Sequence, residues 1–167
     1  LWYALEQAAI GTIRTGRASG VHGLGLAMEG DASTDQWFLT IALPSGRKLY
    51  YARPYLMPGD RGDSIHYQGM DQTTKKWKDL ETYGGKLVEN CVQAIARDCL
   101  AESIERLEAA GYPVVFHVHD EVVIDADAAN PDATLTDVCQ IMSRPVDWAP
   151  ELPLRAEGWT DSYYKKD

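Results

Sequence analysis

The segment of residues 83–110 constrains the fold more than any other, because its side chains repeat with the period of an α-helix. With a rotation of about 100° per residue, four apolar residues fall in one arc of the predicted helix: Val88, Val92, Ile95 and Cys99. Four polar residues fall together on the opposite side: Lys86, Asn90, Gln93 and Arg97. Gly111 follows, as a glycine with left-handed backbone commonly does at a helix end. The pattern predicts a long helix with one face in the core and a second face of hydrogen-bonding side chains.

Two short apolar runs come after this helix, at residues 114–118 and 122–124. Both are rich in β-branched residues, which favour strands. His119, Asp120 and Glu121 separate the two runs, so the spacing predicts a β-hairpin with polar residues at its turn. We expect this hairpin to be central in an antiparallel sheet and the helix to back that sheet. The expected fold class is therefore α+β.

The remaining segments give shorter patterns. A helix is predicted over residues 1–17, with Gly16 near its end, and a loop over the glycine-rich residues 18–34. Alternating apolar residues over 37–43, followed by Pro44-Ser45-Gly46, predict a hairpin whose second strand begins near residue 48. The prediction is completed by a loop over 57–63, short strands over 64–71 and 74–81, a helix from 130 to about 144, and a strand or extended tail over 154–164.

The composition limits the classes of function. The 167 residues carry a formal net charge of −9, which argues against a nucleic-acid-binding protein unless the basic part of a binding channel lies outside these residues. The three cysteines have no C-x-x-C spacing, which favours a reducing cytoplasm, and Cys91 and Cys99 are expected in the core. No apolar run is long enough to span a bilayer, so no membrane partner is expected.

The predicted turn carries the most chemistry. An acidic pair buried between two hydrophobic strands is costly unless a cation or hydrogen-bond donors compensate it. Asp120 could hold Mg²⁺ there, because this ion prefers oxygen ligands. A two-metal phosphoryl transfer also needs a second carboxylate from elsewhere in the fold. His117 and His119 share one face of a strand and leave a zinc site open, and a solvated turn is a third interpretation.

Two parts of the sequence together resemble one enzyme family. The run from Tyr83 to Asp98, with the long helix and Val118-His119-Asp120-Glu121-Val122-Val123 after it, resembles the family A (DNA polymerase I type) DNA polymerases. In that family the His-Asp-Glu turn is the third motif of the palm. Residues 43–49 and 157–164 resemble phage- and prophage-encoded members more narrowly. The resemblance covers roughly residues 35–167 and implies an incomplete sheet of the palm type.

The resemblance also implies roles for individual residues. Asp120 would bind the catalytic Mg²⁺ ions, with Mn²⁺ as a substitute, and Glu121 would be a secondary ligand. His119 would lie against the primer end, and Gln93 would contact the minor-groove edge near the primer terminus. Three further side chains of the helix would face the DNA: Arg97, Asn90 and Lys86.

The function implied by the resemblance is that of a DNA-directed DNA polymerase. Such an enzyme extends a primer 3′-hydroxyl with dNTPs on primer-template DNA, here in the cytoplasm of a bacterial host or phage-infected bacterium. Residues 1–34 would be a helix and loop leading in from the fingers, and residues 35–167 the carboxy-terminal portion of the palm. Residues 1–82 show no pattern of the first palm motif or of the fingers helix. We therefore expect the chain alone to be inactive and, with sheet edges exposed, to self-associate.

Two other classes of function stay open on the residues alone. One is a metal-dependent hydrolase that uses His117, His119 and Asp120. The other is a non-catalytic domain whose acidic surface binds a partner. Stoichiometric zinc would favour the hydrolase, and a partner complex that is indifferent to Asp120 would favour the interaction domain.

Overall fold

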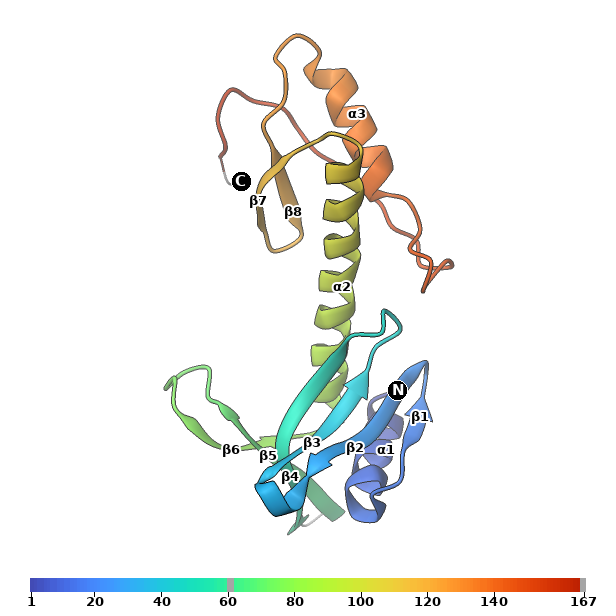
Figure 1. Ribbon diagram of the computed structural model, residues 1–167, viewed down its shortest axis with the longest axis vertical. Coiled ribbons are helices and arrows are strands. Elements are labelled where there is room, and N and C mark those ends of the chain that lie inside the picture. Colours follow the sequence, from blue (N-terminus) through green and yellow to red (C-terminus); the bar gives the residue numbers. More distant parts are fainter. Residues whose placement is uncertain (60–61, 166–167) are drawn as a thin grey trace. The chain divides into compact units, whose positions relative to one another are not determined.

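The computed structural model describes residues 1–59 and 62–165, with the backbone alone at Ala32. The chain forms two compact units, residues 1–95 and residues 96 onward. The long helix α2 (Gly84–Ala109) contributes to both units (Figure 1). The expected division between residues 34 and 35 concerns the parts of a longer polymerase and stays a prediction.

The first unit is an antiparallel sheet whose six strands follow one another in chain order (Figure 1). Helix α1 (Trp2–Thr15) packs against the sheet. It ends as expected at Gly16, whose φ of 69° is the left-handed conformation of a helix cap. The strands are β1 (Ser19–Val21), β2 (Leu24–Asp31), β3 (Gln36–Ala42), β4 (Lys48–Gly59), β5 (Gly62–Met70) and β6 (Trp77–Thr82), with a 3-10 turn η1 (Ala32–Thr34) between β2 and β3.

The core of this unit lies between the sheet and the two helices. Leu39 and Ile41 of β3 are fully buried, as their alternation predicts. The predicted turn at Pro44-Ser45-Gly46 joins β3 to β4, with Gly46 at a φ of 87°. The helices supply the opposite wall of the core through Leu5, Ala9 and Ile10 of α1 and Leu87, Cys91 and Ala94 of α2.

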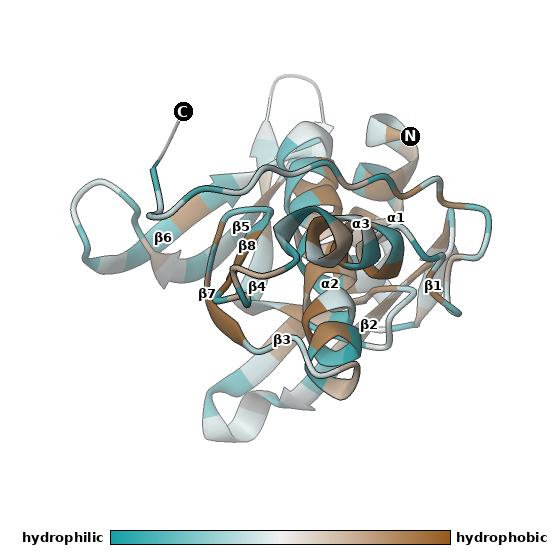
Figure 2. Ribbon diagram, turned by 90° about the horizontal axis from the view of Figure 1, so that it is seen from above, coloured by the Kyte–Doolittle hydropathy of each residue, from teal (hydrophilic) through white to brown (hydrophobic). Residues whose placement is uncertain are grey.

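The predicted core face of α2 is confirmed in part, because Val88 and Ile95 pack against the core and Cys99 is buried. Leu87, Cys91 and Ala94 are buried, whereas Val92 is 57% exposed. Apolar residues at positions 87, 88, 91, 92, 94 and 95 cover an arc of about 160° around the helix. The spacing alone does not say which edge of so wide an arc meets the sheet. Figure 2 shows both hydrophobic (brown) and hydrophilic (teal) segments on α2.

Two predicted loops are strands. Residues 18–34 form β1 and β2, because Leu24 and Leu26 point into the core while the backbone pairs with β3. Strand β4 also continues through Gly59, and β5 starts at Gly62. Residues 60 and 61 of that predicted loop lie outside the described residues. The strands predicted over 64–71 and 74–81 are confirmed as β5 and β6.

The second unit places the predicted hairpin beside two helices. After Gly111, at a φ of 87°, β7 (Val114–Val118) and β8 (Glu121–Ile124) pair antiparallel, and α3 (Pro131–Met142) follows. Val114, Val122 and Ile124 pack against a small core. That core consists of Leu107 of α2 with Val138 and Ile141 of α3.

The hairpin is not central in the larger sheet. Within the described residues β7 and β8 form a two-stranded sheet of their own. Two short apolar strands have the same pattern whether their outer edges are paired or free, so the sequence could not distinguish the two cases. The α+β class is confirmed, and residues 154–164 form an extended tail without a strand.

An ion pair fastens the segment after α3 to α2. The Arg106 guanidinium donates to a Glu102 carboxylate oxygen at 2.5 Å and to the carbonyl oxygens of Arg144 and Pro145 at 2.9 and 2.8 Å. The Trp148 indole N–H donates to the second Glu102 oxygen at 2.9 Å. Because charged partners strengthen hydrogen bonds, this network holds residues 144–148 against the helix.

Within the part of the chain that the structure describes, no helix has the length and apolar character to cross a bilayer.

Candidate functional site

The predicted catalytic turn is a two-residue connection at the end of the hairpin. Val118 of β7 pairs with Glu121 of β8, so His119 and Asp120 make the turn between them. His119 has a φ of 52°, a backbone conformation that is uncommon outside glycine and costs about 1–3 kcal/mol. The packing of the two strands therefore holds a strained residue next to Asp120.

The carboxylates of the turn are exposed, as in the interpretation of a solvated turn, and are not buried between the strands. Asp120 and Glu121 both lie at the surface. The strands bury the apolar side chains of Val122 and Ile124 only in part, and the polar tip extends beyond that core. Because both carboxylates are accessible to solvent, their charge does not require a compensating cation for folding. The tip is instead open to ligands that come from outside the unit.

The carboxy-terminal tail contacts the same hairpin. The rings of Phe116 and Tyr164 meet edge to face with centroids 5.1 Å apart. The Tyr164 hydroxyl donates to Glu121 Oε2 at 3.5 Å, a long contact. Tyr164 was not among the predicted site residues, although it lies in the segment 157–164 that carried part of the family resemblance. The tail thus contacts one of the two acidic side chains.

The structure describes no complete metal site. Over residues 1–59 and 62–165, no three His, Cys, Asp or Glu side chains form a group suited to a metal ion. The hydrolase built on His117, His119 and Asp120 therefore gains no support from the geometry. Asp120 and Glu121 could still hold a hard cation such as Mg²⁺ if water, phosphate or a further carboxylate completed its coordination.

The polar face of α2 within the first unit has partners of its own. The Asn90 amide donates to the Tyr51 hydroxyl of β4 at 3.0 Å, and Gln93 donates to the Glu89 carboxylate one turn earlier at 3.3 Å. The Lys86 ammonium lies 6.0 Å from the ring centre of Tyr83. Burial raises the pKa of Tyr51 to about 12, so its hydroxyl stays protonated at neutral pH. Asn90 thus anchors the helix to the sheet, a role that the sequence did not indicate.

The predicted site residues are divided between the two units. Lys86, Asn90 and Gln93 belong to the first unit, and Arg97 lies in the second unit with the hairpin turn. Arg97 is exposed, as are Lys86, Asn90 and Gln93. A shared role of these four side chains therefore stays a prediction. Within the second unit the structure brings together His119, Asp120 and Glu121.

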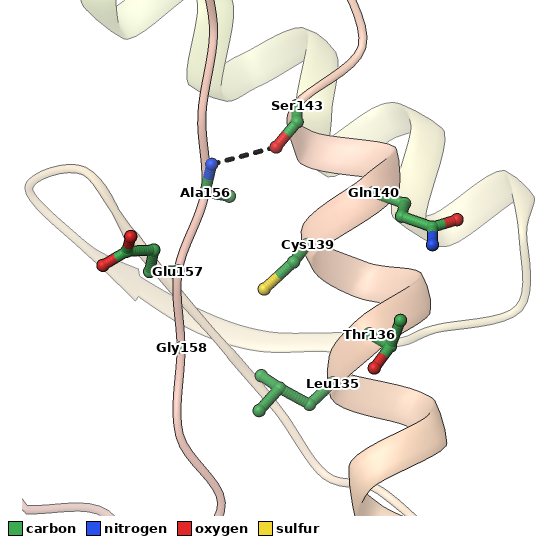
Figure 3. A pocket seen from close by; sticks show the side chains of 8 residues that line it. All are labelled: Leu135, Thr136, Cys139, Gln140, Ser143, Ala156, Glu157 and Gly158. Atoms are coloured by element: carbon green, nitrogen blue, oxygen red, sulfur yellow. Dashed lines mark hydrogen bonds between the residues drawn. The ribbon is translucent and has the colours of Figure 1, made fainter.

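A separate groove in the second unit contains none of these residues. It is open, has a volume of about 620 Å³, and lies between α3 and residues 156–158 (Figure 3). Ser143 Oγ accepts a hydrogen bond from the backbone N–H of Ala156 at 2.9 Å. Gly158 lies so close to α3 that an added Cβ would be 2.8 Å from a methyl carbon of Leu135. The tail therefore packs closely on α3 beside the groove.

One comparison relates the chain to a named protein. The chain is 44% identical over 169 aligned residues to a protein named DNA polymerase from Bacillus phage SP02. The alignment covers 99% of this chain and 25% of that protein. The chain therefore spans about a quarter of the length of the curated relative that it matches. No protein-family model matches the chain, and no solved structure matches it.

Proposed function

We propose that the chain is a portion of a family A DNA polymerase of the phage and prophage type, which extends a primer 3′-hydroxyl with dNTPs by two-metal nucleotidyl transfer. The observation that carries the proposal is the 44% identity along nearly the whole chain to a protein named DNA polymerase. The exposed Asp120 at a hairpin turn supports it, because a catalytic carboxylate must be accessible to metal, primer and nucleotide.

In this proposal the turn supplies part of the metal site. Asp120 binds Mg²⁺ or Mn²⁺, Glu121 assists it, and His119 lies near the primer end. Gln93 contacts the minor groove, where an amide suits base edges because it both donates and accepts hydrogen bonds. Arg97 and Lys86 contact phosphates.

The proposal makes the 167 residues insufficient for catalysis. Two-metal transfer needs carboxylates from separate parts of the fold, and the resemblance assigns the second carboxylate and the dNTP-binding residues to motifs outside this chain. The acidic net charge of this chain is then compatible with DNA binding by the complete polymerase, because other parts of the enzyme would supply the basic DNA channel. We place the complete enzyme in the bacterial cytoplasm, where its template and dNTPs are found.

Primer extension by the complete polymerase tests the role of Asp120. Asp120→Asn should lower kcat by about a thousandfold or more, since the loss of a metal ligand removes several kcal/mol of transition-state stabilisation. Asp125→Asn is the matched control, because Asp125 is exposed just after β8 and the change in charge is identical. Extension that survives Asp120→Asn at the level of the control would refute the assignment.

The isolated chain offers a second readout of the same site. Titration with Mn²⁺, followed by electron paramagnetic resonance, should detect weak binding in the millimolar range that Asp120→Asn abolishes and Asp125→Asn retains. Primer extension by the isolated chain should be undetectable. Activity of the chain alone would mean that these residues contain both metal-binding carboxylates.

A further inference from the structure

The connection between β5 and β6 is basic in an acidic chain. Lys75, Lys76 and Lys78 surround Trp77, so four consecutive residues contain three of the 16 lysines and arginines of a chain whose net charge is −9. We call residues 71–78 the lysine–tryptophan loop. Figure 1 shows it extending past the end of the sheet in the first unit.

Asp71 holds this loop in one conformation. Its Oδ1 accepts hydrogen bonds from the backbone N–H groups of Thr73 at 3.1 Å and Thr74 at 2.6 Å and from the Thr74 hydroxyl at 2.8 Å. Its Oδ2 lies 2.8 Å from the Lys78 ammonium. The bond from Lys78 and those from Thr74 hold the pKa of Asp71 well below its usual range. Backbone bonds between Asp71 and both Lys75 and Lys76, each 2.9 Å, close the turn.

The loop presents its other side chains outward. Lys75 and Lys76 are exposed, and in the described part of the chain neither ammonium has an ion-pair partner. Trp77 is 59% exposed and lies opposite Met70, which is 50% exposed. Asp79 places one exposed carboxylate nearby, whereas the Asp71 carboxylate is occupied by the loop itself. The tip therefore combines two accessible cations with an accessible aromatic ring.

We propose that the lysine–tryptophan loop binds single-stranded DNA. Lys75 and Lys76 contact successive phosphates, and the Trp77 ring stacks on an unpaired base. A duplex offers no such base, because its bases already stack on one another, and a lipid headgroup has no flat ring for the indole to stack on. The choice of DNA as the partner rests on the proposed function, since a polymerase holds a single-stranded template ahead of the primer end.

The two kinds of contact have different signatures in a binding assay. The probe is fluorescein-labelled oligo(dT), with affinity measured by anisotropy at several salt concentrations in EDTA and without dNTPs. Lys75→Gln/Lys76→Gln should weaken binding and reduce the slope of log K against log salt by about 1.4, or 0.7 for each phosphate contact on a single strand. Trp77→Ala should weaken binding by about 5- to 150-fold and leave that slope unchanged. Trp77→Phe should restore most of the loss.

A matched control separates local contacts from general charge. Arg14→Gln/Arg17→Gln removes two positive charges from exposed side chains of the same unit, although Arg14 pairs with Asp63 at 2.6 Å. This double variant should change the slope little. Circular dichroism checks that each variant is folded. Equal effects of the two double variants, binding of duplex that is indifferent to Trp77, or loop-dependent binding of anionic vesicles without binding of oligo(dT) would each overturn the inference.

The same design keeps this inference distinguishable from the proposed function. Binding in EDTA involves neither Asp120 nor nucleotidyl transfer. If the loop variants lose binding of oligo(dT) but primer extension does not depend on Asp120, only the proposed function is contradicted. If primer extension requires Asp120 but the loop variants bind oligo(dT) normally, only the inference about the loop is contradicted.

Discussion

Replacing Gly84 with alanine is expected to destabilise the first unit, because the start of α2 lies directly against α1 there. A Cβ at Gly84 would lie 2.3 Å from the carbonyl oxygen of Trp2, 2.8 Å from its carbonyl carbon and 3.2 Å from the Cβ of Glu6. Ordinary carbon–oxygen contacts are about 3.3–3.6 Å, so the backbones would have to separate by roughly 1 Å. The close atoms belong to a helix backbone and cannot rotate away.

Two unfavourable contributions determine how much free energy of unfolding Gly84→Ala should lose. Overpacking of this kind costs about 1–3 kcal/mol. The shift would also stretch the hydrogen bond from the Gly84 backbone N–H to Glu6 Oε1, now 3.2 Å, and a bond to a charged acceptor contributes about 1.5–3 kcal/mol. The higher helix propensity of alanine returns at most about 1 kcal/mol. We expect a net loss of about 2–4 kcal/mol in the free energy of unfolding.

Gly11→Ala is the matched control in the neighbouring helix. Gly11 lies inside α1, and among the described residues no atom outside its own stretch of helix lies within 4 Å of the position of an added Cβ. The same chemical change should therefore stabilise the chain by about 0.5–1 kcal/mol. Urea unfolding followed by circular dichroism measures both variants. Similar unfolding midpoints for Gly84→Ala and Gly11→Ala would refute the close packing of Trp2 on the start of α2.

Two further predictions concern buried hydroxyl groups in the first unit. Thr82 is 2% exposed and its Oγ1 has no hydrogen-bond partner within the described structure. Thr82→Val should therefore raise the free energy of unfolding by about 1 kcal/mol in the same assay. A loss of stability would mean that the hydroxyl has a partner. Tyr51 is buried and its pKa is raised from 10.0 to about 12, so the folded chain retains this proton more tightly than the unfolded chain. Its contribution is complete below pH 10 and should fall by up to about 2–3 kcal/mol as the pH rises to 12, and the unfolding curves of Tyr51→Phe should lack that part of the pH dependence. Absorbance of tyrosinate near pH 10 for Tyr51 would contradict its burial.

Local patterns predicted the elements whose side chains repeat strictly. The helix over residues 84–109, the hairpin β7–β8 and the turn at Gly46 needed only periodicity, β-branched runs and a glycine with positive φ. The strands within residues 18–34 were not predicted, because the glycines of this segment interrupt the alternation of apolar and polar residues. Pairing of β2 with β3 supplies the missing hydrogen bonds and buries Leu26.

The candidate site was predictable only as a list of residues. Spacing placed Asp120 at a hairpin turn and placed Gln93 on the polar side of a helix, and the family resemblance supplied their roles. Spacing could not show that the carboxylates are exposed, that Asn90 donates to Tyr51, or that Tyr164 reaches Glu121. Those partners come from segments at least 39 residues away in the chain.

The sequence by itself determined which segments are helical, where the hairpin turns, and that the chain is similar to part of a DNA polymerase. These properties depend on neighbours within a few residues, or on residue identity alone. Only the tertiary structure decided which side of α2 meets the sheet, that the hairpin stands as a separate two-stranded sheet, and which side chains remain open to solvent. Burial depends on contacts between distant segments, and a wide apolar arc such as that of α2 fits more than one orientation until those segments are in place.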